Sequence, residues 1–471
     1  MDFEALMQTS DPSPEQAPTA IAAAPGVATG RLVANAAMLG SMVVLVKLVA
    51  FGKDWLVAQR FGASDEVDAF LVALVLPSYA IVVAQSFALA FVPTYIRVWH
   101  GSGAAAALRL TRGVLGCAAA ALVLTTIVLV PLAPLLLRLI AAGFDDEKLA
   151  LTLRLLYVLA PTILVAGFSS VFASLLNAHE RFRAAALAPL ALPAFTLVLF
   201  WLGRERYGIY ALAVGTLVGF AAEFVILGLA AHRQRLLAWP TLQADENARR
   251  VGIQYVPVAL ASLLMSSSMV IDQSMAATLA SGSVATLSYG NKMVSLLLGI
   301  VAASLSTVLF PRFSKLIAAG RWDELKQLLR TFGQLIFALA IPAVVLLIVG
   351  SEPLVRLVFE RGAFTSADTI AAAGVQRWLA PEIPFYILVM VGSRLLSALD
   401  AYQVTLRIGV LNLVLNVVGN YVFMSLFGVK GIAMSTSLVY VAATVVTLVA
   451  IRFKLAERSE TPAATFDSVS P

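Results

Sequence analysis

The chain has 471 residues, of which 60% are hydrophobic and 13% are charged, whereas a soluble domain has about 45–50% and 25%. These proportions exclude a soluble globular protein, a disordered chain and a collagen-like fibre. The single cysteine, Cys117, excludes a disulfide framework and a cysteine-based metal site. The net charge of +6 carries little information by itself, because membrane insertion depends on how charge is distributed among loops. We therefore expect an all-α, multi-pass membrane protein.

Residues 1–30 are rich in Ala and Pro, carry acidic residues and contain no Lys or Arg. This composition predicts a disordered cytoplasmic tail and lacks the basic and apolar regions of a signal peptide. Apolar stretches of membrane-spanning length follow. They predict twelve transmembrane helices at about 33–59, 67–96, 110–137, 150–177, 184–202, 208–231, 251–279, 284–311, 328–350, 369–398, 404–427 and 430–451. The polar residues 454–471 predict a second cytoplasmic tail.

The distribution of basic residues predicts the orientation of these spans. An even number of spans places both termini on one side, and that side holds 19 of the 33 Lys and Arg residues, against 10 on the other side and four inside spans. Cytoplasmic loops carry the excess of positive charge in membrane proteins. We therefore expect both termini in the cytoplasm.

The sequence also indicates an internal duplication with an offset of about 217 to 223 residues. The matching segments include Ala63-Ser64 with Ala280-Ser281, Phe91-Val92-Pro93 with Leu309-Phe310-Pro311, Leu159-Ala160-Pro161 with Leu379-Ala380-Pro381, and Gly208-Ile209 with Gly431-Ile432. They predict two six-helix halves, 31–235 and 236–453. Because six is even, the halves share one topology and are expected to be related by a pseudo-two-fold axis along the membrane normal, with a substrate path between them.

Charged residues inside the apolar stretches are the strongest candidates for function. A charge within a span costs about 2.5–3.5 kcal/mol on insertion scales, so such side chains are expected to face a partner or a cavity. The residues are Lys47, Lys53, Asp54, Asp68, Asp272 and Lys292. The three lysines predict a basic cavity that attracts phosphates, although snorkelling of their long side chains to the interface is an alternative. Asp68 could instead complement a helix dipole.

Three asparagines, Asn412, Asn416 and Asn420, recur every four residues and therefore form one stripe on a helix. Hydrogen bonding between helices is the ordinary explanation of such a stripe. The alternative is that their oxygens, with a carboxylate such as Asp272, bind a small cation.

No motif in the chain indicates an enzyme. A phosphate-binding loop of the type G-x-x-x-x-G-K-[ST] is absent, and no base is placed beside a hydroxyl nucleophile. We therefore expect a transporter without a cofactor, driven by an ion gradient, the membrane potential or the gradient of its substrate.

Several segments together are similar to the MurJ/MviN lipid II flippase family of the multidrug/oligosaccharidyl-lipid/polysaccharide (MOP) exporter superfamily. The resemblance covers about residues 33 to 450 and is carried by Leu45 to Asp54, Arg60 to Ser64, Val67 to Phe70, Leu279 to Val284, Tyr289 to Lys292 and Arg361 to Thr365. It implies a transporter in the bacterial inner membrane that moves undecaprenyl-diphosphate-linked saccharides to the outer leaflet by alternating access.

The resemblance also implies a set of site residues. Arginines of the family that hold the diphosphate match Lys47, Lys53 and Lys292, and acidic positions of its first two spans match Asp54 and Asp68. A sodium site found in some members matches a second set, Asp272, Asn416, Asn420, Ile432 through its carbonyl oxygen, and Thr436. Sodium would then be the coupling ion.

Two departures from the family pattern leave the substrate open. Lysines replace the arginines, and two further spans that form a groove for the lipid tail in typical lipid II flippases do not follow the twelfth span. The substrate is then lipid II or the repeat unit of an exopolysaccharide or O-antigen. The other functions we consider are a cation-coupled multidrug antiporter of the same superfamily and a non-transporting scaffold for cell-envelope synthesis. As partners we expect membrane lipids and cell-envelope enzymes but no nucleic acid, and the chain is expected to be a monomer.

Overall fold

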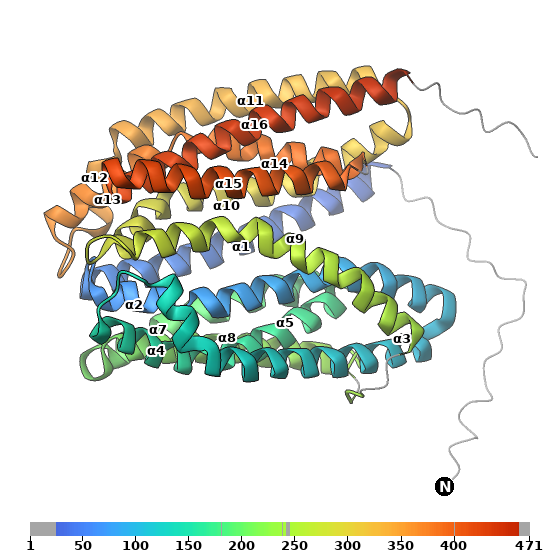
Figure 1. Cartoon of the computed structure of the whole chain (residues 1–471). Coiled ribbons are helices and arrows are strands. Elements are labelled where there is room, and N and C mark those ends of the chain that lie inside the picture. The colour runs from blue at the N-terminus through green and yellow to red at the C-terminus, as the bar shows by residue number, and fades with distance from the viewer. Residues whose placement is uncertain (1–24, 180, 238, 242–244, 400, 461–471) are drawn as a thin grey trace, which may run out of the picture.

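The computed structural model describes the chain except residues 1–24, 180, 238, 242–244, 400 and 461–471, so the first and last parts of the two expected tails lie outside the described residues. All regular secondary structure in the described part is helical (Figure 1). The N-terminal half contains α1 (Pro25–Phe61), α2 (Asp65–Ala73), α3 (Val75–Ile140), α4 (Asp146–Leu159), α5 (Pro161–Ala178), α6 (Phe182–Leu187), the 3-10 helix η1 (Ala188–Leu190), α7 (Ala191–Tyr207) and α8 (Ile209–Arg233).

The C-terminal half is also built of helices. It contains α9 (Glu246–Ala276), α10 (Ser283–Ala318), α11 (Trp322–Val349), α12 (Ser351–Phe359), α13 (Ser366–Leu379), α14 (Glu382–Ala398), α15 (Tyr402–Phe427) and α16 (Val429–Glu460).

The expected apolar stretches all lie on these helices, with shifts at their ends. The first helix already begins at Pro25, a residue suited to the first turn, and the last helix ends at Glu460, so residues 25–30 and 454–460 are helical. The stretches 67–96 and 110–137 are joined in the run Asp65–Ile140, where Gly103 interrupts the helical backbone with φ 80° and ψ 175°.

By length and composition, nine helical stretches within the described residues can cross a membrane. The number is ten if Ser366–Leu379 and Glu382–Ala398, bent by 44° at a short break, are one span. One of these stretches contains two of the expected spans, and the expected span 33–59, on α1, is not among the stretches counted, so the count and the twelve expected spans are compatible.

Helix breaks recur in the two halves with an offset of 220 residues. The α4–α5 break at Pro161 corresponds to the α13–α14 break at Pro381. Gly208 between α7 and α8 has φ 52° and ψ −129°, and Gly428 between α15 and α16 has φ 58° and ψ −138°. Residues with a side chain rarely adopt this backbone conformation, so both positions favour glycine. The structural partner of Gly208 is therefore Gly428, three residues before the Gly431 expected from the sequence.

The helices form two bundles, and α9 crosses between them (Figure 1). At its beginning, Tyr255 donates a hydrogen bond to the Val83 carbonyl oxygen of α3 at 2.8 Å. Near its end, Asp272 accepts hydrogen bonds from α15. One hydrophobic core runs through the C-terminal half and into part of the N-terminal half, and a second core joins α3, α5 and α8 to the beginning of α9.

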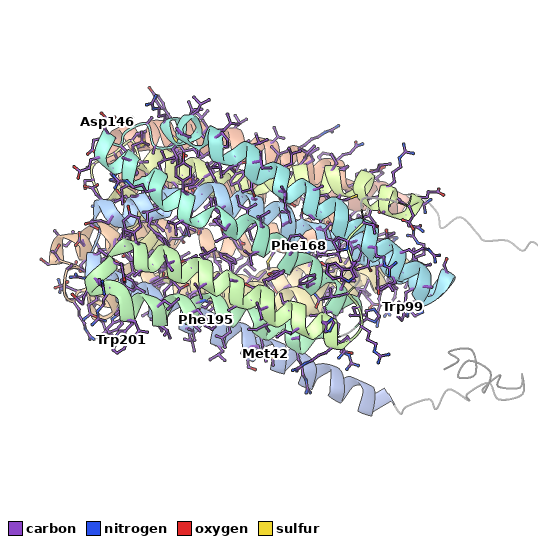
Figure 2. All side chains as sticks on the ribbon, turned by 90° about the horizontal axis from the view of Figure 1, so that it is seen from below. Met42, Trp99, Asp146, Phe168, Phe195 and Trp201 are labelled. Atoms are coloured by element: carbon purple, nitrogen blue, oxygen red, sulfur yellow. The ribbon has the colours of Figure 1, made fainter. Side chains whose placement is uncertain are left out.

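The outer surface of the bundles is rich in apolar side chains, as expected of helices in contact with lipid (Figure 2). Trp201 lies at one end of the molecule and Trp99 at the other. Tryptophans prefer the two membrane interfaces. We use these residues to name the ends: the Trp201 end carries the turns at Gly62, Gly282 and Gly362, and the Trp99 end carries the α5–α6 loop and the end of α8.

The closest approach of α7 and α8 depends on Gly219, since a Cβ atom there would lie 2.6 Å from the Leu192 carbonyl oxygen. We expect Gly219→Val to destabilise the protein by about 1–3 kcal/mol through overpacking and to lower its melting temperature in detergent, followed by size-exclusion chromatography after heating. The control is Gly409→Val, because no atom lies within 4 Å of a Cβ at that helical position. Equal losses in both variants would contradict the packing argument.

Candidate functional site

The candidate site lies where α1 of the N-terminal half packs against α10 of the C-terminal half. Asp54 forms ion pairs with Lys53 at 2.8 Å and with Lys292 of α10 at 2.8 Å. Two turns earlier on α1, the side chain of Lys47 extends along Gly299 of α10, where a Cβ atom would lie 3.3 Å from Lys47 Cε. The order of these contacts shows that α1 and α10 run antiparallel. The three predicted lysines therefore lie along one seam between the halves, which we call the lysine seam.

The lysine seam has an excess of positive charge that remains accessible. Three ammonium groups and one carboxylate leave a formal charge of +2 on these side chains. The side chains of Lys53, Asp54 and Lys292 are 25%, 15% and 26% exposed, and Lys47 is exposed. A shared carboxylate compensates part of the cost of holding two amines between helices. The arrangement can accept an anion with several oxygens, since each ammonium group offers three donors.

Glycine at 299 has a direct role in the seam. The absence of a side chain leaves room for the end of the Lys47 side chain beside the α10 backbone, since a Cβ atom at Gly299 would lie 3.3 Å from Lys47 Cε and 3.6 Å from Nζ.

Asp68 was predicted to belong to the same binding site as these lysines, but its partners in the structure lie outside the lysine seam. Its side chain is 1% exposed, and it accepts hydrogen bonds from the backbone amides of Gly282 at 2.9 Å and Ala285 at 2.7 Å at the beginning of α10. It also forms an ion pair with Lys148 of α4 at 2.8 Å. A carboxylate at a helix N-terminus binds free amides and complements the helix dipole. The dipole interaction considered from the sequence is therefore made with a helix of the other half.

Further contacts close the Trp201 end between the halves. The Ala363 amide donates to the Gln59 carbonyl oxygen at 2.8 Å. At Gly362 a Cβ atom would lie 2.2 Å from the same oxygen, and at Gly282 it would lie 2.2 Å from the Ala63 carbonyl oxygen. Only glycine permits such backbone approaches. We call this set of contacts, together with those of Asp68, the outer gate.

The predicted cation ligands meet in the C-terminal half. The Asp272 carboxylate of α9 accepts from Asn416 Nδ2 at 3.1 Å and from Asn420 Nδ2 at 2.7 Å, both on α15. On α16, the Thr436 hydroxyl donates to the Ile432 carbonyl oxygen at 2.9 Å. Both asparagines are buried, and their Oδ1 atoms have no hydrogen-bond partner within the described residues. Hydrogen bonding between helices has support, because the amide nitrogens bridge α15 to α9. Cation binding also has support, because the Oδ1 atoms of both amides are without a partner among the described residues.

Sequence reasoning missed one functional candidate, Lys148, and treated another, Glu382, as a weak candidate. Lys148 was assigned to a loop, but its side chain is only 8% exposed and contacts Asp65, Asp68 and the ring of Phe144. Glu382 at the beginning of α14 is buried, and its Oε2 has no hydrogen-bond partner within the described residues. An acid directly after Pro381, at the start of an apolar run, was the only sequence signal for it.

The comparisons with known proteins place this arrangement in a class. The structure is similar to that of the lipid II flippase MurJ in an inward closed conformation, with a TM-score of 0.79, 22% identity and coverage of 90% of each chain. It is also similar to an inward-facing multidrug resistance MATE family transporter of the MOP superfamily, with a TM-score of 0.73, 16% identity and coverage of 89% of this chain and 96% of the other. The chain therefore shares its fold with these two membrane transporters.

Sequence comparison then gives the family. The model of the lipid II flippase MurJ family matches residues 57–466. The probable lipid II flippase MurJ of Rhizobium meliloti (strain 1021) is 26% identical over 369 residues, 76% of this chain and 69% of the relative. That of Buchnera aphidicola subsp. Schizaphis graminum is 26% identical over 413 residues, 85% of this chain and 79% of the relative. The chain belongs to the lipid II flippase MurJ family, which confirms the predicted resemblance and a transporter rather than an enzyme.

Asp68 offers a test of the outer gate. We expect Asp68→Asn to weaken the gate, because the neutral side chain loses its ion pair with Lys148 and can no longer accept from both amides as a carboxylate does. A hydrogen bond to a charged group contributes about 1.5–3 kcal/mol, so opening at the Trp201 end should rise roughly tenfold. The measurement is the labelling rate of a cysteine at Ala63 by a membrane-impermeant maleimide, in a chain with Cys117→Ser.

The control for this experiment is Asp323→Asn, which removes an exposed carboxylate at the start of α11. Labelling that is equally slow in the Asp68 variant and in the parent would show that the carboxylate does not hold the gate closed.

Proposed function

We propose that the chain is a flippase that moves an undecaprenyl-diphosphate-linked saccharide from the inner to the outer leaflet of the bacterial inner membrane. The observation that carries this proposal is the lysine seam, where Lys47, Lys53 and Lys292 lie between the halves with a single acidic partner, Asp54. A diphosphate offers several anionic oxygens to such a set of donors. An organic cation would meet repulsion there, so a multidrug antiporter is disfavoured.

The proposed architecture has twelve spans in two six-helix halves, related by a pseudo-two-fold axis, with both termini in the cytoplasm. Helix breaks offset by 220 residues and the matching backbone conformations of Gly208 and Gly428 support the duplication. The excess of Lys and Arg in the loops of the Trp99 end supports a cytoplasmic position for that end. The Trp201 end would then face the periplasm.

In the proposed cycle the outer gate is closed while the diphosphate enters from the inner leaflet and binds the lysines. Binding competes with Asp54, which pairs with Lys53 and Lys292 in the structure. Release outward requires the outer gate to open, so Asp68 must leave the amides of Gly282 and Ala285. A membrane potential that is negative inside favours this direction, by about 2.3 kcal/mol for each full charge moved through 100 mV.

Lipid II is the substrate we propose, because the relatives are named lipid II flippases. The site chemistry is directed at the diphosphate, which is common to lipid II and to the repeat units of other polysaccharides. The saccharide must therefore be identified by transport experiments.

Lys292 is the position that tests the proposed site. We expect Lys292→Gln to reduce lipid II translocation in proteoliposomes by at least tenfold, since a lost hydrogen bond to a charged group costs about 1.5–3 kcal/mol. Lys292→Arg keeps the charge and should retain much of the activity. Complementation of a strain depleted of its own lipid II flippase is the second measurement.

Lys454→Gln is the matched control, because Lys454 is a partly exposed lysine at the end of α16 that pairs with Glu457 at 2.7 Å. Full transport by Lys292→Gln at normal membrane levels would contradict the role of the seam. Rescue of a strain lacking a polysaccharide repeat-unit flippase, without rescue of the lipid II strain, would change the proposed substrate but keep the site.

We further propose that Asp272, Asn416, Asn420, Ile432 and Thr436 bind sodium as the coupling ion. Carboxylate, amide and backbone carbonyl oxygens are suitable ligands for a small hard cation. The unpartnered Oδ1 atoms of the two buried asparagines support such a site. Binding would require both amides to rotate, because their nitrogens now face Asp272.

Sodium should therefore stabilise the protein specifically. At a concentration of 100 times Kd, the expected stabilisation is about 2.7 kcal/mol, seen as a higher melting temperature in NaCl than in choline chloride of equal ionic strength. Asp272→Asn should abolish this difference, whereas Asp54→Asn, in the lysine seam, should leave it unchanged. An identical response of the parent chain to both salts would argue against the site.

A further inference from the structure

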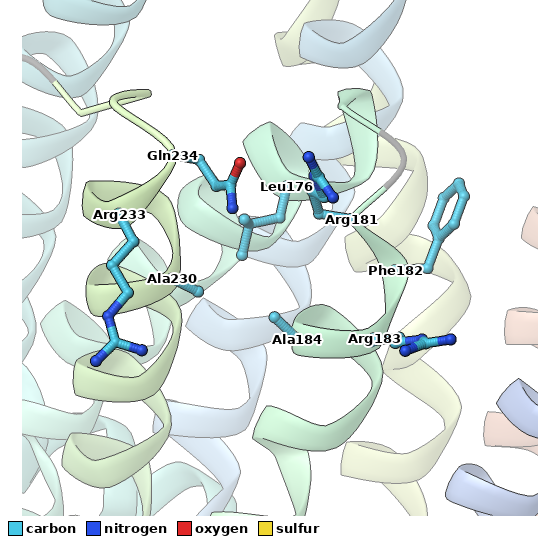
Figure 3. A pocket seen from close by; sticks show the side chains of 8 residues that line it. All are labelled: Leu176, Arg181, Phe182, Arg183, Ala184, Ala230, Arg233 and Gln234. Atoms are coloured by element: carbon cyan, nitrogen blue, oxygen red, sulfur yellow. The ribbon is translucent and has the colours of Figure 1, made fainter.

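A pocket at the Trp99 end has no place in the transport cycle proposed above. One side of the pocket is formed by the end of α5 and the beginning of α6, and the other side by the end of α8. Its volume is about 430 Å³. Gln234 and Arg181 lie over it with Leu176 between them, and Arg233 and Arg183 lie on opposite sides with their side chains directed away from it (Figure 3). We call it the arginine pocket.

The backbone on the α8 side takes an unusual form to build this pocket. The Leu236 amide donates to the Ala231 carbonyl oxygen at 3.1 Å, and the Arg235 amide to the His232 carbonyl oxygen at 2.8 Å. This pair of bonds ends a helix with one residue in the left-handed region, usually glycine. Here that residue is Arg235, with φ 56°. The end of α10 has the ordinary solution, since Gly320 with φ 65° precedes Arg321, whose amide bonds to Leu316.

The electrostatics of the pocket favour an anion. The two segments 179–183 and 232–235 contain four arginines and one acidic residue. Within the described residues, Arg181, Arg183 and Arg233 form no ion pair with an acidic side chain. Burial, and secondarily the charge of Arg181, hold the pKa of the neighbouring His179 below its usual value.

Exposed apolar side chains beside the arginines indicate that the anion belongs to a lipid. Phe182 is 44% exposed and Leu187 is 41% exposed, at the two ends of the short helix α6. A soluble anion would gain nothing from these side chains, whereas acyl chains would cover them. Basic pockets between helices on the cytoplasmic side are suited to anionic headgroups.

We propose that the arginine pocket binds the phosphate headgroup of an anionic phospholipid of the inner leaflet. The leaflet follows from the proposed orientation, in which the Trp99 end is cytoplasmic. The phosphate lies between Arg181 and Gln234, the long side chains of Arg183 and Arg233 turn toward it from both sides on binding, and an acyl chain covers Phe182. Such a lipid would link α5, α6 and α8 and fix the position of the N-terminal half at the inner interface.

The test is native mass spectrometry of the full chain in detergent, titrated with phosphatidylglycerol and separately with phosphatidylcholine. We expect preferential binding of phosphatidylglycerol, reduced roughly a hundredfold by Arg181→Ala/Arg183→Ala/Arg233→Ala, since each basic residue contributes about fivefold near an anionic lipid. The corresponding triple lysine variant should retain most of the binding and shows whether the alanine variant fails merely by unfolding.

The matched control is Arg249→Ala/Arg250→Ala/Arg452→Ala, which removes the same charge from exposed positions at the Trp99 end outside the pocket. Equal binding by the parent and the pocket variant, or an equal loss in the control variant, would overturn the proposal. Displacement of the lipid by inorganic phosphate at similar concentration would identify a free-anion site instead. The measurement is made in detergent and does not depend on transport or orientation, so its failure is distinguishable from failure of the flippase function.

Discussion

The seam between the two halves depends on the pairing of charges that the membrane would otherwise exclude. Asp54 allows Lys53 and Lys292 to lie close together between α1 and α10, and Gly299 makes room for Lys47 beside them. The pairing is incomplete, because Asp54 pairs with two of the three amines and Lys47 forms no ion pair with an acidic side chain of the described residues. If every amine had its own carboxylate, the seam would only hold the two halves together. With the excess of positive charge, the seam can in addition bind an external anion.

The outer gate also depends on a carboxylate paired between the two halves, but there the carboxylate closes the interface instead of leaving it open to an anion. Asp68 is fully partnered, by two amides of α10 and by Lys148, and it is buried, so it has no remaining capacity for a substrate. In the proposed cycle, the carboxylate of Asp68 at the beginning of α10 serves closure, and the shared carboxylate of Asp54 beside Lys292, further along α10, serves binding. Charge alone did not distinguish these roles in the sequence, since both aspartates lie in the same motif-rich segment.

Much of the fold followed from the sequence because hydrophobic length and loop charge are local properties. The apolar stretches and the asparagine stripe were predictable from spacing along single helices. The meeting of the stripe with Asp272 was one of two alternatives and was implied by the resemblance to the family. The breaks at Pro161 and Pro381 were not predicted, since each proline lies inside an expected span. The partner of Asp68, the burial of Lys148 and the arginine pocket were not, because each depends on helices distant in the chain. The shift from Gly431 to Gly428 has a similar cause, since only the backbone conformation reveals which glycine ends the helix.

The crossing helix α9 constrains any movement between the bundles. Its first part is attached to α3 through Tyr255, and its last part is attached to α15 through Asp272. Pro257 lies directly after the first attachment and lacks an amide hydrogen, so the helix is easier to bend there. A rocking motion of the halves would therefore bend α9 near Pro257. The same motion would displace Asp272 and its hydrogen bonds to Asn416 and Asn420, because they lie on the part of α9 beyond the bend.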